Sequence, residues 1–286
     1  MGQTCILTGM ILNTMPVGEY DKRITILTRE RGKITAFARG ARRPKSSLQA
    51  ATNLFCFGTF EAYEGRSSYT VVKAEISNYF RELAMDLDKT YYGCYFLELA
   101  DYFCQENNDC INQLKLVYQT LRALNVPSLS PKLVRVIYEL KTLVYFGVYP
   151  NVFACTSCGS REQLWCFDEK SNGVMCRECQ PGPVKYPLDE AALYTMQYIV
   201  TAPVEKLYTF TVTEEVLGQV TKLIQYYMRQ YVEKELKTPV SMLFCTLCKA
   251  EHSFCPQFKN HCTFILLYAF QHEMDHLDGI MFTDRI

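Results

Sequence analysis

The sequence predicts an α+β protein in which a small closed β-barrel precedes an α-helical domain that carries an inserted four-cysteine knot. Three observations lead to this prediction. Short segments rich in β-branched and aromatic residues fill the first 80 positions. Apolar residues then recur every three or four positions, and two Cys-X-X-Cys pairs interrupt that helical part. We expect a barrel at 1–80, a helical domain at 81–243 with the knot at 155–179, and an atypical tail at 244–286.

The first 80 residues contain five segments with the composition of β-strands. They are short, rich in Ile, Val, Thr and aromatic residues, and separated by turn residues. Five short strands in so few residues favour a closed barrel of the oligonucleotide-binding type over an open sheet. The expected strands are 5–12, 23–28, 34–39, 54–63 and 69–76.

Basic residues are concentrated between positions 21 and 45 of this barrel. Nine basic residues stand there against two acidic ones, a local excess of seven positive charges in a chain of zero formal net charge. Such a density predicts one continuous positive surface for a phosphate backbone, although a basic run can also be an ordinary solvated face. The candidate DNA-binding residues are Arg23, Arg29, Arg31, Lys33, Arg39, Arg42, Arg43 and Lys45.

Several aromatic residues of the barrel are candidates for stacking on bases. At strand periodicity most of them should instead fill the barrel interior, so no single one is preferred. The segment 40–47 is expected to form a flexible loop that closes over a strand of nucleic acid. The aromatic candidates are Phe37, Phe55, Phe57, Phe60, Tyr63 and Tyr69.

The four-cysteine knot has the spacing of a zinc site. Cys155 and Cys158 form one pair, and Cys176 and Cys179 form a second pair after 17 intervening residues. Each pair directs two thiolates at one point, and two pairs complete a tetrahedron. Four thiolates leave no open position for water or substrate, so we expect structural zinc. The alternative is four ordinary buried or disulfide-linked cysteines.

The rest of the chain to position 243 has helical periodicity. Three apolar stripes predict packed helices between 87 and 149, and helices at 188–200 and 213–236 should pack on them after the knot. These stripes indicate a core rather than a cofactor site. Fourteen cysteines without a secretory signal favour a reducing cytoplasm, and no apolar run is long enough for a membrane span.

Taken together, these features resemble the bacterial RecO family of recombination mediators over residues 1 to about 243. The resemblance implies a nucleoid-associated cytoplasmic protein that binds single- and double-stranded DNA, anneals complementary strands and helps load recombinase. It implies RecR and single-strand-binding protein as partners, zinc as a structural cofactor, and no catalytic residue. The resembling motifs are Asp21-Lys22-Arg23, the segments 27–33 and 40–45, the four cysteines, and the closing helix at 213–239.

The last 42 residues have a different composition, because they hold all four histidines of the chain and four of its cysteines. Within them, His272 and His276 form a His-Glu-X-X-His pattern with Glu273, which resembles the last helix of peptide deformylase. That family uses a third ligand from a distant segment and a glycine-rich pocket segment, and neither is present. The composition change near Phe244 favours a fused fragment, by gene fusion or a join between reading frames.

Three functions therefore remain open at the level of sequence. The first is a non-enzymatic DNA-binding mediator of DNA repair. The second is a metal-dependent deformylase-type hydrolase with His272 and His276 as metal ligands and Glu273 as general base. Its third ligand would have to come from Cys255, Cys262 or His261, which no motif positions. The third is a zinc-stabilised adaptor that docks proteins and has little affinity for DNA.

Overall fold

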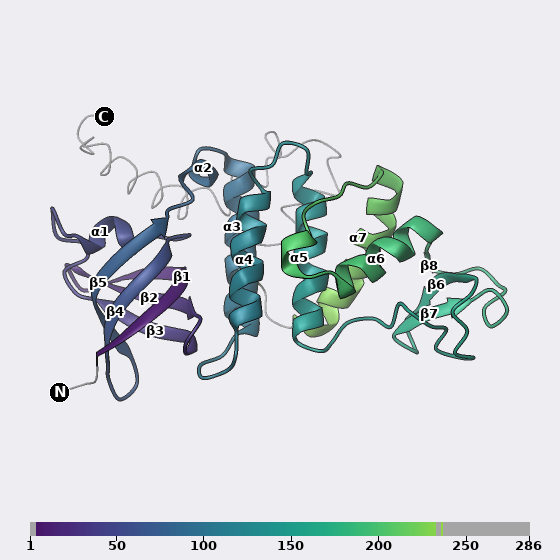
Figure 1. Ribbon diagram of the computed structural model, residues 1–286, viewed down its shortest axis with the longest axis horizontal. Coiled ribbons are helices and arrows are strands. Elements are labelled where there is room, and N and C mark those ends of the chain that lie inside the picture. The colour runs from purple at the N-terminus through teal and green to yellow at the C-terminus, as the bar shows by residue number, and fades with distance from the viewer. Residues whose placement is uncertain (1–3, 233–235, 237–286) are drawn as a thin grey trace. The chain divides into compact units, whose positions relative to one another are not determined.

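The N-terminal strands form a closed barrel in the order β1-β2-β3-β5-β4 (Figure 1). The computed structural model describes residues 4–232 and residue 236. Neighbouring strands are antiparallel, except that β3 and β5 are parallel where the barrel closes. This confirms the predicted barrel. The strands are β1 (Thr4–Val17), β2 (Asp21–Thr28), β3 (Gly32–Ala38), β4 (Phe57–Glu64) and β5 (Tyr69–Asn78).

Alternation along each strand separates the barrel core from its outer surface. In β2, Ile24 and Ile26 point inward and are fully buried, whereas Arg23, which directly precedes Ile24, is exposed. A short helix, α1 (Leu48–Ala51), follows the loop after β3 and places Leu48 against the same core. This helix was not predicted, because four residues are too short to show helical periodicity.

The three helices expected between 87 and 149 are present. Asp86 and Ser130 cap two of them by accepting hydrogen bonds from the N–H groups of Lys89 and Leu133. A further short helix joins the barrel to this group. The elements are α2 (Arg81–Ala84), α3 (Leu87–Phe103), α4 (Ile111–Ala123) and α5 (Pro131–Tyr145).

Two more helices follow the knot and pack on α5, as expected, and a 3-10 turn between them, which was not predicted, packs on α4. They are α6 (Glu190–Thr201), η1 (Val204–Lys206) and α7 (Glu214–Tyr231), and the Thr213 side chain caps α7 as its sequence predicts. Lys141 of α5 is buried and donates to the last carbonyls of α6, with Nζ 2.9 Å from Val200 O and 2.7 Å from Ala202 O. This lysine therefore satisfies carbonyls that the helix itself leaves unpaired.

The knot contains a three-stranded sheet with the order β7-β6-β8. Its strands are β6 (Leu164–Asp168), β7 (Gly173–Cys176) and β8 (Tyr186–Pro187). No strand was predicted in this part of the chain, yet Cys166, Phe167 and Val174 of this sheet are buried. Phe167 packs on Tyr227 of α7, with ring centroids 5.6 Å apart, so the core of the knot is shared with the last described helix.

The barrel and the helices share a packed boundary. Phe55 is buried against Gly93 of α3, where an added Cβ would lie only 2.9 Å from the Phe55 ring. Tyr118 of α4 packs on Phe57, with centroids 4.7 Å apart. Gly93 is therefore required because it lets the Phe55 ring approach the α3 backbone closely, and not because it makes the backbone flexible. Among the described residues, no helix is both long and apolar enough to cross a bilayer.

Candidate nucleic-acid interface and metal centre

Arg23 lies on the outer surface of the barrel in a row that crosses three strands. It is opposite Met15 of β1 and Phe37 of β3 in the strand register. Its guanidinium is exposed and lies 3.3 Å from the Met15 sulfur, and Phe37 is half-buried beside it. The strand alternation therefore places a cation next to an accessible aromatic ring.

The basic loop after β3 is fixed to the β1–β2 turn. The Gly40 N–H donates to the Asp21 carboxylate at 2.7 Å, and the Arg42 N–H donates to Tyr20 O at 2.9 Å. Gly40 has φ of +67°, a conformation that glycine adopts without the cost that other residues incur. The Arg43 guanidinium lies over the Tyr20 ring, 5.2 Å from its centroid. The predicted loop is thus held by specific hydrogen bonds.

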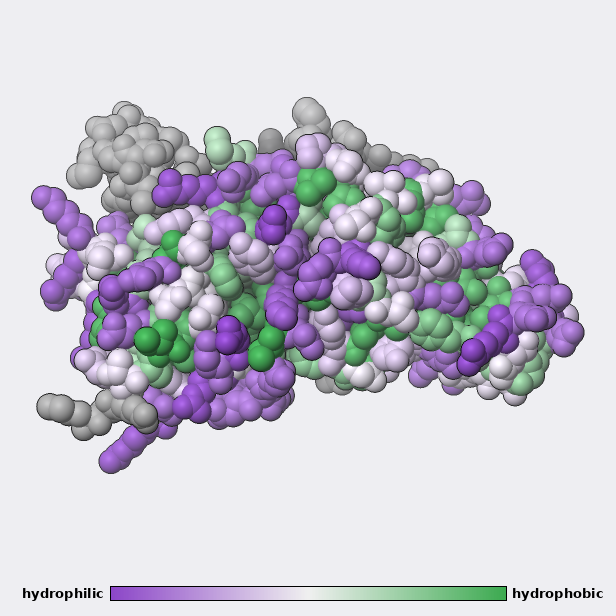
Figure 2. All heavy atoms as spheres, in the orientation of Figure 1, coloured by the Kyte–Doolittle hydropathy of each residue, from purple (hydrophilic) through white to green (hydrophobic). Residues whose placement is uncertain are grey.

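Five of the eight predicted cations gather around this turn. All five are exposed, and none lies within ion-pair distance of a carboxylate from the described part of the chain. Figure 2 shows hydrophilic side chains projecting from the barrel end of the drawn face, with apolar residues in small separate patches. We call this group the basic loop surface: Arg23, Arg39, Arg42, Arg43 and Lys45.

The other three predicted cations lie at the opposite end of the β2–β3 hairpin, roughly 23 Å away along an eight-residue strand. Arg29 is exposed, but Arg31 pairs with Glu64 at 3.6 Å and Lys33 pairs with Asp101 at 3.2 Å. The structure therefore divides the expected continuous surface in two. Strand geometry explains the division, because residues six or more positions apart on one strand lie at its opposite ends.

This second group is part of the junction with the helices. The Lys33 N–H donates to Gln105 O at 3.1 Å, and the Asn107 N–H donates to Arg31 O at 3.0 Å. Gly32 fits here because a side chain would lie 2.5 Å from Gln105 O. The hairpin tip is therefore committed to contacts within the chain, and the basic loop surface at the other end is the stronger candidate for a ligand.

Most of the candidate stacking residues are buried, as strand periodicity predicts. Phe55, Phe60 and Tyr69 are 1%, 0% and 4% exposed. Tyr63 of β4 is 46% exposed and Phe37 half-buried, and both are in register with Thr70 of β5 on the outer surface. Only Phe37, Phe57 and Tyr63 keep accessible area, and Phe57 is engaged with Tyr118.

The four predicted cysteines converge on one point. The sulfur atoms of Cys155, Cys158, Cys176 and Cys179 all lie within 4.8 Å of one another, and the Cys158–Cys176 sulfur distance is 3.7 Å. A tetrahedral zinc–thiolate centre with bonds of about 2.3 Å has sulfur atoms about 3.8 Å apart. Four sulfur donors at this separation fit zinc and leave no fifth group to bind a substrate.

Backbone groups prepare one of these thiols for metal binding. Burial disfavours the Cys155 thiolate, but N–H groups of Cys158, Cys176 and Ser157 outweigh burial and lower the pKa of Cys155 to about 6. The Thr156 N–H also donates to Val174 O at 2.9 Å, which joins the first cysteine pair to β7. A thiolate is therefore available at neutral pH where the metal would bind.

The second cysteine pair is braced by the single tryptophan of the chain. The Trp165 indole N–H donates to Gln180 O at 3.1 Å, one residue beyond Cys179. The Arg177 guanidinium lies 4.6 Å from the centre of the Trp165 rings. Trp165 thus contacts a residue between the two cysteines and the residue after them, and would report on the conformation of this pair.

Some residues with roles in this site were not found from sequence. Tyr20 supports Arg43, and its position in the turn directly before a basic strand is the signal that could have identified it. Lys22, counted among the basic residues, is 4% exposed and donates to the Asn53 side chain at 2.7 Å. Its alternation with the exposed Arg23 on β2 would have indicated this.

The fold and site define a class of protein with an N-terminal oligonucleotide-binding-type barrel, a helical domain and a four-cysteine cluster. Family models described as "Recombination protein O N terminal" and "Recombination protein O C terminal" match residues 1–80 and 84–239. The chain belongs to the RecO family.

Similar curated proteins carry the same family name. A protein named DNA repair protein RecO from Acetivibrio thermocellus is 32% identical over 232 residues, which cover 79% of this chain and 91% of that protein. Proteins of the same name from Bacillus pumilus and Bacillus subtilis are 30% and 28% identical, each over 80% of this chain and 90% of its relative. The alternative metal site at His272 and His276, with Glu273, lies outside the described residues, as does the rest of the deformylase-like tail.

Proposed function

We propose that this chain is a DNA-binding recombination mediator that acts in DNA repair. The observation that carries the proposal is the basic loop surface, where five exposed cations have no carboxylate partner among the described residues. Of these, Arg43 lies over the Tyr20 ring and Arg23 is in register with Phe37. Cations of this kind bind phosphate backbones, and accessible rings stack on unpaired bases. The names of the relatives, which describe DNA repair proteins, support the same role.

The finer part of the proposal concerns partners. We infer that the barrel holds single- and double-stranded DNA, that two complementary strands are annealed, and that recombinase is loaded on strands coated by single-strand-binding protein, with RecR as a partner. No catalytic residue is assigned, because positioning of strands requires only binding groups. These roles rest on the family relationship and on the charge of the barrel.

Zinc is the ion proposed for the four-cysteine cluster. Cys155, Cys158, Cys176 and Cys179 would hold it, and its role would be to stabilise the knot. A structural zinc can contribute on the order of 10 kcal/mol to the folding of a small module. Apart from the cluster, the sheet of the knot buries only the side chains of Cys166, Phe167 and Val174, a core small enough to need this stabilisation.

The test is salt-dependent binding of a labelled single-stranded oligonucleotide to the full chain. Reversal of Arg39, Arg42 and Arg43 to glutamate should lower the affinity at least about tenfold and reduce the dependence of log K on log salt. The control reverses three exposed cations of the helical domain, Lys115, Arg122 and Lys206. Equal affinities for the wild type and the barrel variant would reject the proposed interface and leave the adaptor function in its place.

A further inference from the structure

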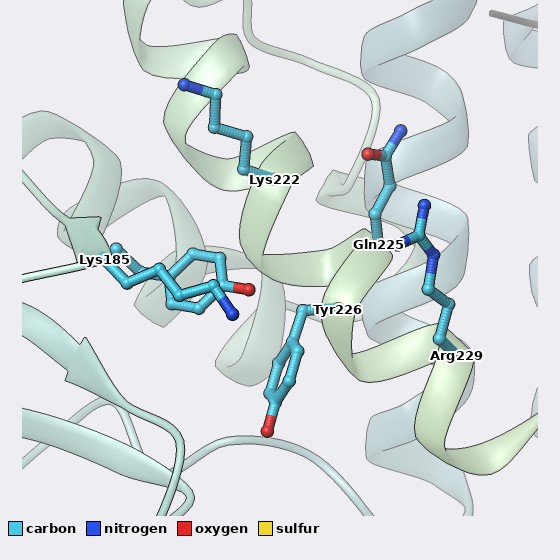
Figure 3. A pocket seen from close by; sticks show the side chains of 6 residues that line it. Lys185, Lys222, Gln225, Tyr226 and Arg229 are labelled. Atoms are coloured by element: carbon cyan, nitrogen blue, oxygen red, sulfur yellow. The ribbon is translucent and has the colours of Figure 1, made fainter.

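An open hollow on the helical domain combines cations with aromatic rings. It has a volume of about 370 Å³ and lies between β8 and α7. Figure 3 shows Lys222, Gln225, Tyr226 and Arg229 projecting from successive turns of α7, with Lys185 beside the strand side of the hollow. We call it the α7 hollow; its lining residues are Lys185, Tyr186, Lys222, Gln225, Tyr226 and Arg229.

The two cations of α7 are free to bind a ligand. Lys222 and Arg229 are exposed, and neither has a carboxylate of the described residues within ion-pair distance. They are seven positions apart, so two helical turns place them on one face. Residues 81–232 hold seventeen acidic against fourteen basic residues, so this group is not a consequence of a basic domain.

The two tyrosine rings of the α7 hollow are held in place by packing on the sheet of the knot. Tyr186 and Tyr226 have centroids 5.4 Å apart, and both pack on Phe167 of the knot sheet at 6.1 Å. Lys185 lies 5.1 Å from the Tyr186 ring centre, and its Nζ is 2.6 Å from the Glu169 carboxylate. Both tyrosines remain partly exposed, so ring area is available at a fixed position.

We propose that the α7 hollow is a second nucleic-acid contact, which binds an unpaired DNA segment through its phosphates and one stacked base. Lys222 and Arg229 would contact successive phosphates, and Tyr186 or Tyr226 would stack on the base. This inference rests on the proposed DNA-binding function. It assigns the contact to elements distinct from the barrel strands, so that one chain holds two segments of single strand.

An unpaired strand fits this hollow better than an acidic protein segment does. The hollow is open and has polar walls, whereas a peptide anchor needs an enclosed apolar pocket for a side chain. Base stacking needs only one accessible ring face beside a cation, and every base offers such a face. The hollow therefore offers a ring for one base and cations for the phosphates on either side of it.

The experiment compares two double variants of the full chain that change charge equally. Lys222→Glu with Arg229→Glu alters the hollow, and Lys115→Glu with Arg122→Glu is the control, because this pair is exposed on α4 with the same seven-residue spacing. Affinity for a labelled deoxythymidine oligomer of about 45 nucleotides is measured across salt concentrations, a length several times the 4–16 nucleotides of one barrel.

The hollow variant should bind the oligomer at least about fivefold more weakly than the control variant. The slope of log K against log salt should fall by about 1.4, since each lost contact to a single strand contributes about 0.7. A third variant, Tyr226→Leu, keeps the charge and should weaken binding about fivefold or more at an unchanged slope, because one stacked base is lost. Circular dichroism and thermal unfolding of each variant identify any that fails to fold.

Equal losses in the two double variants would overturn the proposal, because they would show an effect of net charge alone. The proposal is also overturned if a hexaglutamate peptide binds the wild type but not the hollow variant while both bind the oligomer equally. A loss on reversal of Arg39, Arg42 and Arg43 without a loss in the hollow variant rejects only the second contact. The converse result supports the hollow and rejects the barrel interface.

Discussion

Lys33 of β3 and Asp101 of α3 form an ion pair, with Nζ 3.2 Å from the Asp101 carboxylate, and the same ammonium donates to the Asp101 carbonyl. This pair joins the barrel to the first long helix. A cation that charge pattern alone assigns to DNA is therefore used within the chain. Its partner comes from a segment 68 positions away, which no local pattern could have indicated.

We expect Lys33→Met to reduce stability with little effect on DNA binding. Both side chains are about one-third exposed, so loss of the pair and the hydrogen bond should cost only about 1 kcal/mol of unfolding free energy. Urea unfolding of Lys33→Met, Asp101→Asn and the double variant measures the coupling between them. Oligonucleotide affinity should change less than in Arg39→Met. A larger loss of affinity in Lys33→Met than in Arg39→Met would place the DNA contact at the hairpin tip instead.

Asp21 should be needed for DNA binding although it is acidic. Its carboxylate accepts the Gly40 N–H at 2.7 Å and so fixes the loop that carries Arg39, Arg42 and Arg43. Asp21→Ala removes a negative charge, which on electrostatic grounds would strengthen binding. We expect instead a loss of about threefold to tenfold, because a charge-assisted hydrogen bond contributes about 1.5–3 kcal/mol and removal of the acidic charge offsets part of its loss.

The matched control for Asp21→Ala is Glu19→Ala, two positions away in the same turn. Glu19 is exposed, and its carboxylate bonds the Tyr20 side chain, whereas the Asp21 carboxylate bonds the backbone of the basic loop at Gly40. Oligonucleotide titration at one fixed salt concentration compares the two. If both variants bind more tightly than the wild type, the loop does not need its anchor and acts only through charge.

The sequence was sufficient for the barrel strands, the longer helices and the four-cysteine cluster, because these depend on local patterns. Strand alternation placed Phe60 and Tyr69 inside the barrel, and the Thr213 cap marked the start of α7. The cysteine spacing alone predicted that Cys155 and Cys176 lie close together. Each of these features is encoded within a few residues or in a fixed separation along the chain.

The division of the basic cluster could not be predicted in the same way. Whether Arg31 and Arg43 are available depends on Glu64 and Tyr20, and only the barrel closure and the β1–β2 turn bring those partners near. The α7 hollow likewise joins Lys185 to Arg229 across 44 positions. Charge counting gives the number of cations in a segment but not which of them tertiary contacts neutralise.

Cys110 makes stability depend on pH between about 7 and 9. A hydrogen bond from the Cys104 thiol lowers the pKa of Cys110 to about 7, against an opposing effect of burial, and Cys110 lies at the N-terminus of α4. A thiol whose pKa is lower in the folded state stabilises the fold above its unfolded pKa, here 9.0, and loses that contribution as the pH falls through 7.

The Cys110 thiolate should therefore contribute a rise of about 1–2 kcal/mol in unfolding free energy from pH 7 to pH 9, which is measured as the difference between the wild type and Cys110→Ser. Cys110→Ser should flatten this rise, because serine does not ionise in the range. Cys94→Ser is the control, since burial raises the pKa of Cys94 to about 12 and keeps it protonated throughout. Urea unfolding at four pH values measures the effect. An equal slope in the wild type and Cys110→Ser would exclude a thiolate at Cys110.

Loss of the four-cysteine centre should unfold the knot and leave the rest of the chain folded. Cys176→Ser should remove one equivalent of zinc per chain and change the emission of Trp165, which bonds to the carbonyl beside Cys179. Cys166→Ala is the control, because Cys166 is buried in β6 but does not belong to the cluster. Trypsin should then cut the Cys176→Ser variant after Arg161, Lys170 or Arg177, which mass spectrometry identifies. Equal zinc content in both variants would mean that these cysteines do not bind the metal, and the knot would then have to be stabilised by Phe167 and its contacts with α7.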